Sequence, residues 1–193
     1  MDYHVILGIL ALIIGLVSYI PYLYHVLKNK TKPHIFSWFI WGLLMGIAFI
    51  VQLTEEAGPG SWIIGLGSAS CLFIATISYI KWKKDYITKS DWICFIAAIL
   101  GIIFWVITKN PLIAVIIITG VDAIAFIPTF RKAYHSPHEE TVVTYAISGF
   151  DMFLSILALE NLNLTTALYP ASLVVTNTLF SLMTVIRRHV RHK

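Results

Sequence analysis

The sequence predicts an all-α integral membrane protein with seven transmembrane helices. Of the 193 residues, 58% are hydrophobic and only 12% are charged, and the mean hydropathy is +0.81. A soluble domain of this length has too little interior to bury so many apolar side chains. About 20 consecutive apolar residues span a bilayer as a helix. The chain has seven such runs, near residues 4–27, 35–53, 61–81, 92–108, 111–133, 141–159 and 165–186.

The distribution of basic residues predicts the orientation of these helices. Of the 14 Lys and Arg residues, 13 follow the first, third, fifth or seventh run, whereas Lys109 follows the fourth. Cytoplasmic loops of membrane proteins are enriched in Lys and Arg. We therefore expect the N-terminus outside and the C-terminus in the cytoplasm, with the cell (inner) membrane as the location. No basic residue precedes the first run, so we expect a retained helix and not a cleaved signal peptide.

The two halves of the chain share a pattern at an offset of 107 residues. Pro21 aligns with Pro128, which places SYIPYLYHVLKNKTKPHIFSWFIWG beside AFIPTFRKAYHSPHEETVVTYAISG. Ile-Pro, a basic loop, a Ser/Thr-aromatic pair and a glycine recur in step. We expect two triple-helix units, residues 1–84 and 111–193, joined by a linker helix within 85–110. Corresponding helices are four positions apart in the order of the spans, with three spans between them, so both units have the same orientation. The result is a 3+1+3 arrangement of parallel repeats.

Three polar side chains lie near the middle of the last three runs. Asp122, Asp151 and Asn177 are each ten or eleven residues from a charged residue at the cytoplasmic end of their run, or ~15 Å at a rise of ~1.5 Å per residue. A carboxylate facing lipid at this depth is costly, so both aspartates should face the bundle interior or a wet cavity. No Lys or Arg shares their depth, so each gains stability by taking up a proton or binding a cationic substrate. The alternative is a buried hydrogen-bond donor between helices.

Aromatic residues gather near the cytoplasmic ends of the runs. Tyr22, Trp38, Trp41 and Tyr145 can line the mouth of a pathway, where paired Trp rings can stack on a planar substrate. Anchoring of the rings at the membrane interface is the alternative. Both hypotheses place these four side chains near one side of the membrane.

Prolines and glycines predict bends and close contacts. Pro21 and Pro128 each leave a carbonyl in the preceding turn without its helical donor, so each permits a bend. Gly42-x-x-x-Gly46 favours a close approach of two helices, either within the chain or between two copies in a homo-oligomer.

Two segments have the residues of a helix start. Asn110 followed by Pro111 predicts the start of the fifth run. Ser136, Pro137 and Glu139 predict a start of the sixth run at the proline, with the serine as N-cap and the glutamate completing a capping box.

These features resemble the PQ-loop/SWEET superfamily of small seven-helix transporters. Two triple-helix units surround a linker helix, and each unit opens with a helix that bears a proline near its cytoplasmic end, followed by a short basic loop. Pro21 and Pro128 match the family prolines, but Tyr22 and Thr129 stand in place of the signature glutamine. The resemblance covers nearly the whole chain. It implies that the two prolines act as hinges for alternating access.

The resemblance also implies site residues. Sugar-transporting members carry an asparagine in the third helix of each unit; Asn177 matches the second, and Ser70 and Cys71 stand in place of the first. Span 6 lacks the proline and Trp of those members, which disfavours a sugar. Proton-coupled members that carry amino acids have an acid just ahead of the motif, and Asp122 is similar to it.

We therefore expect a secondary transporter or facilitator of a small polar metabolite, an amino acid or similar compound rather than a sugar. It would work by alternating access, with proton coupling through Asp122. Two alternatives stay open: a vitamin or nucleoside facilitator of the nicotinamide riboside transporter type, and a non-transport receptor or assembly protein on the same fold.

Other function classes are disfavoured. No nucleophile with its base, metal triad or phosphate loop is visible, so we do not expect an enzyme. Cys71 and Cys94 both fall within spans, which makes a disulfide or a thiolate metal site improbable. We expect no metal, no cofactor and no nucleic acid; the expected partners are the solute, protons and the lipid bilayer.

Overall fold

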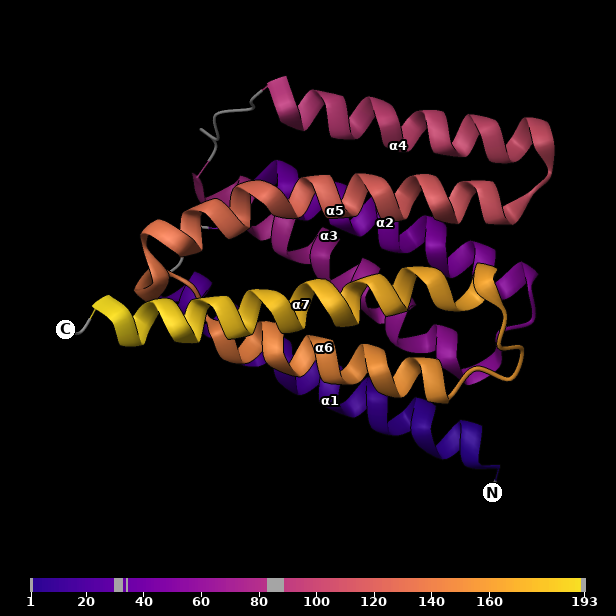
Figure 1. Ribbon diagram of the computed structural model, residues 1–193, viewed down its shortest axis with the longest axis horizontal. Coiled ribbons are helices and arrows are strands. Elements are labelled where there is room, and N and C mark those ends of the chain that lie inside the picture. Colours follow the sequence, from indigo (N-terminus) through magenta and orange to yellow (C-terminus); the bar gives the residue numbers. More distant parts are fainter. Residues whose placement is uncertain (1, 30–32, 34, 83–88, 192–193) are drawn as a thin grey trace.

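The protein is an all-helical, multi-pass membrane protein in the part of the chain that its computed structural model describes, residues 2–29, 33, 35–82 and 89–191 (Figure 1). These residues form the α-helices α1 (Tyr3–Leu27), α2 (Ile35–Thr54), α3 (Trp62–Trp82), α4 (Lys89–Thr108), α5 (Pro111–His135), α6 (Val142–Leu157) and α7 (Leu164–Arg191), with the 3₁₀ turns η1 (Gly58–Ser61) and η2 (Pro137–Glu139). Five helical stretches are long and apolar enough to cross a bilayer: Tyr3–Leu27, Ile35–Thr54, Gly58–Lys81, Pro111–His135 and Leu164–Val190. Apolar α6 is shorter, at 16 residues.

The helix starts agree with the local signals at one position and disagree at another. Asn110 Oδ1 accepts the backbone N–H of Leu112 at 3.0 Å, so the expected start of α5 is confirmed. The expected start of α6 at Pro137 is wrong. The proline opens only the short turn η2, Ser136 makes no capping hydrogen bond, and Glu140 is extended (φ −113°, ψ 147°). An extended residue breaks the helical path, so α6 begins later, at Val142.

Six helices close into a ring, and α4 lies outside it. Going round the ring, each helix packs against the next in the order α1, α3, α2, α5, α7, α6 and back to α1. α4 packs on α5 and α2, and Figure 1 shows it along the outer edge. In the first half the order is α1, α3, α2, and in the second it is α5, α7, α6. Corresponding helices therefore hold corresponding places.

The Gly42-x-x-x-Gly46 spacing serves packing within the first half. A Cβ on Gly42 would lie 2.7 Å from Leu72 Cγ of α3, and one on Gly46 would lie 3.1 Å from Ser68 Oγ. Ser68 also donates a hydrogen bond from Oγ to the carbonyl oxygen of Gly42 at 2.7 Å. The two glycines thus allow α2 and α3 to approach closely.

Most of the described hydrogen bonds between the two halves lie at one end of the ring, which we call the N-terminal end because α1 begins there; one further long bond, from Thr144 Oγ1 to Ser18 O at 3.4 Å, lies towards the other end. Four donors reach across: Gln52 Nε2 to Thr166 O (2.7 Å), Ser155 Oγ to Gly60 O (2.7 Å), Asn161 Nδ2 to Glu55 O (2.8 Å) and Glu160 N to Ala57 O (3.1 Å). We call this set of bonds the interlock. The packing around it is tight, because a Cβ on Gly60 would lie 2.7 Å from Ser155 O.

The bond from Gln52 satisfies a carbonyl that a proline has freed. Pro170 lies inside α7 and has no N–H, so the carbonyl oxygen of Thr166, four residues earlier, has no helical donor. Thr166 is fully buried, and Gln52 is only 1% exposed. A buried carbonyl without a donor would be costly. The glutamine of the first half therefore completes the backbone of the second.

At the opposite end, which we call the basic end, two cations bind main-chain carbonyls of their own half. Lys81 Nζ of α3 donates to Leu27 O at 2.8 Å, where α1 ends. Arg188 Nη2 of α7 donates to Glu140 O at 2.7 Å, just ahead of α6. The two residues are 107 positions apart, so they are equivalents in the repeat. Each therefore ties two segments of its own half together at the basic end.

The bond between Gln52 and Thr166 gives a testable prediction on stability. Gln52→Leu leaves the Thr166 carbonyl without a donor, and we expect the free energy of unfolding to fall by about 1 to 3 kcal/mol. Pro170→Ala restores an N–H at position 170. In that background the loss caused by Gln52→Leu should shrink by about 1 kcal/mol. A denaturant titration of the four proteins in mixed micelles measures this coupling, and purely additive losses would contradict it.

Candidate functional site

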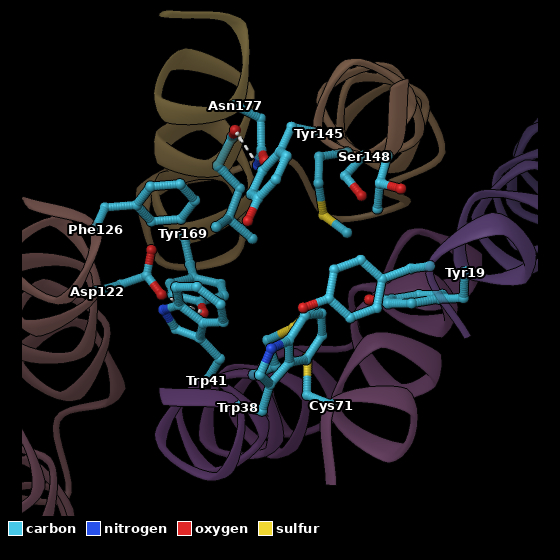
Figure 2. A pocket seen from close by; sticks show the side chains of 15 residues that line it. Tyr19, Trp38, Trp41, Cys71, Asp122, Phe126, Tyr145, Ser148, Tyr169 and Asn177 are labelled. Carbon is cyan, nitrogen blue, oxygen red and sulfur yellow. Dashed lines mark hydrogen bonds between the residues drawn. The ribbon is translucent and has the colours of Figure 1, made fainter. Parts of the chain in front are cut away.

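A cavity of about 80 Å³ lies inside the ring. This is room for several water molecules or a small solute, since one water needs ~10 to 15 Å³. Its lining comes from all six ring helices: Tyr19 and Tyr22 of α1; Trp38, Trp41 and Met45 of α2; Cys71 of α3; Asp122 and Phe126 of α5; Thr144, Tyr145, Ser148 and Met152 of α6; and Tyr169, Leu173 and Asn177 of α7 (Figure 2). The cavity extends from the middle of the ring towards the basic end, because its α2 and α6 residues all lie within the first three turns of those helices, which begin at that end.

Corresponding positions of the two halves face this cavity. Four pairs of lining residues are separated by the repeat offset of 107: Tyr19 and Phe126, Trp38 and Tyr145, Trp41 and Ser148, and Met45 and Met152. The same turns of corresponding helices therefore line one space. The cavity lies where the two halves meet, which is where repeat transporters place their binding sites.

Asp122 is the carboxyl group of this cavity. It is 2% exposed and lies eleven residues into α5, or ~16 Å from the N-terminal end. The Tyr169 hydroxyl of α7 donates to Oδ1 at 3.4 Å, a long hydrogen bond. Oδ2 is buried and has no hydrogen-bond partner among the described residues. A buried oxygen with no donor is a strong acceptor for a proton, a water or a ligand.

Trp41 places an unused donor on the same side of the cavity. Its Nε1 is buried and also without a partner in the described part of the chain. The Trp41 ring packs on Phe126, with centroids 5.4 Å apart, and Phe126 is one turn beyond Asp122 on α5. Figure 2 shows Asp122 and Trp41 on the same side of the cavity. One wall thus carries both an acceptor and a donor that the protein leaves unpaired.

Aromatic rings form most of the remaining wall. Trp38 contacts Trp41 edge to face, with centroids 5.6 Å apart and an interplanar angle of 80°. Tyr22 packs on Trp38 at 4.8 Å. Tyr145 approaches from α6, on the opposite side in Figure 2. All four aromatic residues that the sequence assigned to a pathway therefore line the cavity, and three of them are in mutual contact.

The site residues predicted in the third helix of each half lie partly in the cavity and partly outside it. Asn177 lines the cavity, and its Nδ2 donates to Leu173 O at 2.8 Å within α7. Cys71 also lines it, as a buried free thiol. Ser70, at the repeat equivalent of Asn177, is half-buried and is not among the lining residues. Of the two residues that the sequence predicted at this place of α3, Cys71 lines the cavity and Ser70 does not.

Asp151 lies apart from Asp122. It is 1% exposed but does not line the cavity. Its Oδ2 would be 3.2 Å from a Cβ on Gly15, so it fills the space that this glycine leaves between α1 and α6. Its Oδ1 is buried with no described partner. The two carboxyls share a depth by sequence, but Asp151 points between helices, and they do not form a common site.

The hinge prolines are described only in part. Pro21 lies inside α1, next to the cavity residue Tyr22. Pro128 falls within α5, but its side chain lies outside the described residues. The residues that the structure describes contain no group of three or more His, Cys, Asp or Glu that could hold a metal ion.

Several cavity residues were not predicted. Ser148 could have been found by applying the repeat offset to Trp41, which lies 107 positions earlier, whereas Tyr19, Phe126 and Met45 pair only with residues that were themselves not predicted. Tyr169 carries no such signal. Its role as donor to Asp122 depends on α7 and α5 being neighbours in the ring, which no local pattern indicates.

Three comparisons with known proteins leave the family open. No protein-family model, no curated protein and no solved structure matches this chain. The resemblance to the PQ-loop/SWEET superfamily stays a prediction from the residue pattern, and function must be inferred from the cavity itself.

Proposed function

We propose that this protein is a secondary transporter or facilitator of a small polar solute that works by alternating access. The observation that carries the proposal is the cavity between the two halves, with the buried carboxyl of Asp122 near the middle of the ring. A space of solute size between the two halves, lined by matching positions of a repeat, is the arrangement that alternating access requires.

The two ends of the ring differ in a way that supports this proposal. At the N-terminal end the interlock joins the halves by four hydrogen bonds. Towards the basic end a single long hydrogen bond joins the halves, from Thr144 Oγ1 to Ser18 O at 3.4 Å, while Lys81 and Arg188 bind carbonyls of their own half. The cavity lies between the middle and the basic end, so the present state is closed towards the N-terminal end. Opening that end requires the interlock to break while the halves rock about the cavity, with Pro21 and Pro128 as hinges.

The membrane topology of the proposal has seven spans, including α4 and the shorter α6. The basic end then faces the cytoplasm, because Lys and Arg concentrate there, and the N-terminus lies outside. The location that fits is the cell (inner) membrane. In this orientation the described state faces inward.

Asp122 would serve as the proton or substrate site. An ionised carboxylate in a lipid-embedded ring costs several kcal/mol when nothing pairs with it. Tyr169 supplies one long hydrogen bond, and Oδ2 has none. The ring is therefore most stable when Asp122 holds a proton or a cation, and least stable when the carboxylate is empty. This difference would link movement of the halves to occupancy of the carboxyl.

A non-transport receptor or assembly protein is the competing class. Such a protein has no need of a largely aromatic cavity with one buried carboxyl at its centre, and nothing in the described surface favours it. Transport remains the better explanation of the paired lining and of the unused hydrogen-bonding atoms at Asp122 and Trp41.

We predict that proton-coupled flux depends on Asp122 and not on Asp151. The purified protein is placed in liposomes with a trapped pH dye and challenged with amino acids, amines, nucleosides and sugars. Asp122→Asn should bring solute-dependent proton movement to background, whereas the matched variant Asp151→Asn should stay within about twofold of wild type because it lies outside the cavity. Equal loss in both variants would show that coupling does not reside in the cavity carboxyl.

The closed N-terminal end makes a prediction on access to Cys71. In a Cys94→Ser protein, a small membrane-impermeant thiol reagent should modify Cys71 faster from the side that holds the C-terminus, by about tenfold, because the interlock closes the other side. Mass spectrometry of vesicles sorted by orientation measures both rates. Gln52→Leu should raise the rate from the N-terminal side. Equal rates from both sides in the parent protein would refute the closed end.

A further inference from the structure

We propose that the solute of this cavity is a small organic cation that carries no carboxylate, such as a compact alkylammonium alcohol. The inference rests on the proposed function for its role in transport, but binding can be tested without transport. Four properties of the cavity carry it: the charge of its lining, the character of its walls, the angles between its rings, and its unpaired atoms.

The charge of the lining favours a cation over a zwitterion. Asp122 is the single acidic residue among the described residues that line the cavity, and none of them is Lys, Arg or His. An ammonium group would pair with this carboxylate. The carboxylate of an amino acid would find no cation to pair with, and burying it would be costly. The expectation of an amino acid substrate is therefore replaced by one of a plain cation.

The walls supply a second source of attraction for positive charge. Seven of the lining residues are aromatic: Tyr19, Tyr22, Trp38, Trp41, Phe126, Tyr145 and Tyr169. They come from α1, α2, α5, α6 and α7, so they surround the space on several sides (Figure 2). Aromatic faces attract cations, most strongly when both are removed from water, and cages of such rings are the usual sites for quaternary ammonium groups.

The angles between the rings favour a compact group over a flat one. Neighbouring rings of the lining are not parallel: Trp38 and Trp41 meet at 80° and Phe126 and Tyr145 at 74°, while Tyr22–Trp38 and Trp41–Phe126 are tilted by 46° and 35°. Walls set at steep angles enclose a rounded space, whereas a planar ring is best held between parallel faces. The volume of about 80 Å³ also suits a compact group. A flat nucleoside or vitamin ring fits this arrangement less well than a rounded alkylammonium.

The unpaired atoms indicate a polar end on the solute. Oδ2 of Asp122 is an acceptor without a described partner, and the ammonium group of the solute would pair with it. Nε1 of Trp41 is a free donor and requires an oxygen. A hydroxyl on the solute would meet that need, which favours an amino alcohol over a plain alkylammonium.

Three ligands of similar size test the inference on the purified wild-type protein. Choline is the cation, 3,3-dimethylbutan-1-ol is its uncharged analogue, and glycine betaine has the same ammonium with a carboxylate added. Binding is followed by tryptophan fluorescence and by the shift in thermal unfolding. We expect choline to bind, and each of the other two to bind about tenfold more weakly or worse, because each loses a favourable charge contact or gains an unpaired charge.

Two matched aspartate variants locate the effect. Asp122→Asn should weaken choline binding about tenfold or more and leave the uncharged analogue unchanged, because only the charge contact is lost. Asp151→Asn removes an equally buried carboxyl outside the cavity, and it should keep choline binding within about twofold. If Asp122→Asn does not fold, the comparison of the three ligands on wild type still decides the matter.

Each remaining outcome has a definite meaning. No binding of choline, or equal binding of the three ligands, overturns the inference. So does an equal loss in the two aspartate variants. Choline binding without choline flux in liposomes would keep the cation site and end the transport proposal. Proton-coupled flux of another solute, without choline binding, would keep transport and end the cation proposal.

Discussion

One carboxyl group without a cation, held inside a ring of lipid-embedded helices, is the constraint around which this molecule is arranged. Asp122 is nearly inaccessible and has a single long hydrogen bond from Tyr169. Such a group is unstable in hydrocarbon unless the surroundings are enclosed, partly polar and ready to receive a positive charge. The cavity meets these needs with aromatic faces and a few hydroxyl and amide groups. The rest of the ring serves to keep that space between the two halves.

The repeat explains how a short chain builds such a space. Because corresponding helices occupy corresponding places, one turn of α1 and the matching turn of α5 face each other across the ring, as Tyr19 and Phe126 do. The halves then differ where function needs it. Asp122 stands at the place of Gly15, and Asp151 at the place of Leu44. Under the proposed function, a symmetric scaffold with asymmetric chemistry would allow one half to bind charge while the other supplies shape.

Much of the helix arrangement could be predicted from hydropathy, because burial in lipid leaves long apolar runs few alternatives. The apolar runs and the helices agree closely, and the depth of Asp122 in the membrane could be predicted from its ten-residue separation from Lys132. The direction in which each side chain points could not be predicted. Asp151 shares that depth yet faces α1, since depth along a helix says nothing of its rotation. The delayed start of α6 and the donor role of Tyr169 depend on tertiary neighbours that no short motif records.

The interlock has an uneven dependence on side chains. All four of its acceptors are main-chain carbonyls, those of Glu55, Ala57, Gly60 and Thr166, whereas three of its donors are side chains. A substitution cannot delete a carbonyl. These bonds place no demand on the acceptor side chains, although packing restricts three of the four positions: Ala57 and Thr166 are fully buried, and Gly60 has no space for a side chain. The side chains of Gln52, Ser155 and Asn161, by contrast, are required by the bonds themselves. Single substitutions at these three donor residues can therefore change the strength of the interlock without any change at the acceptor positions.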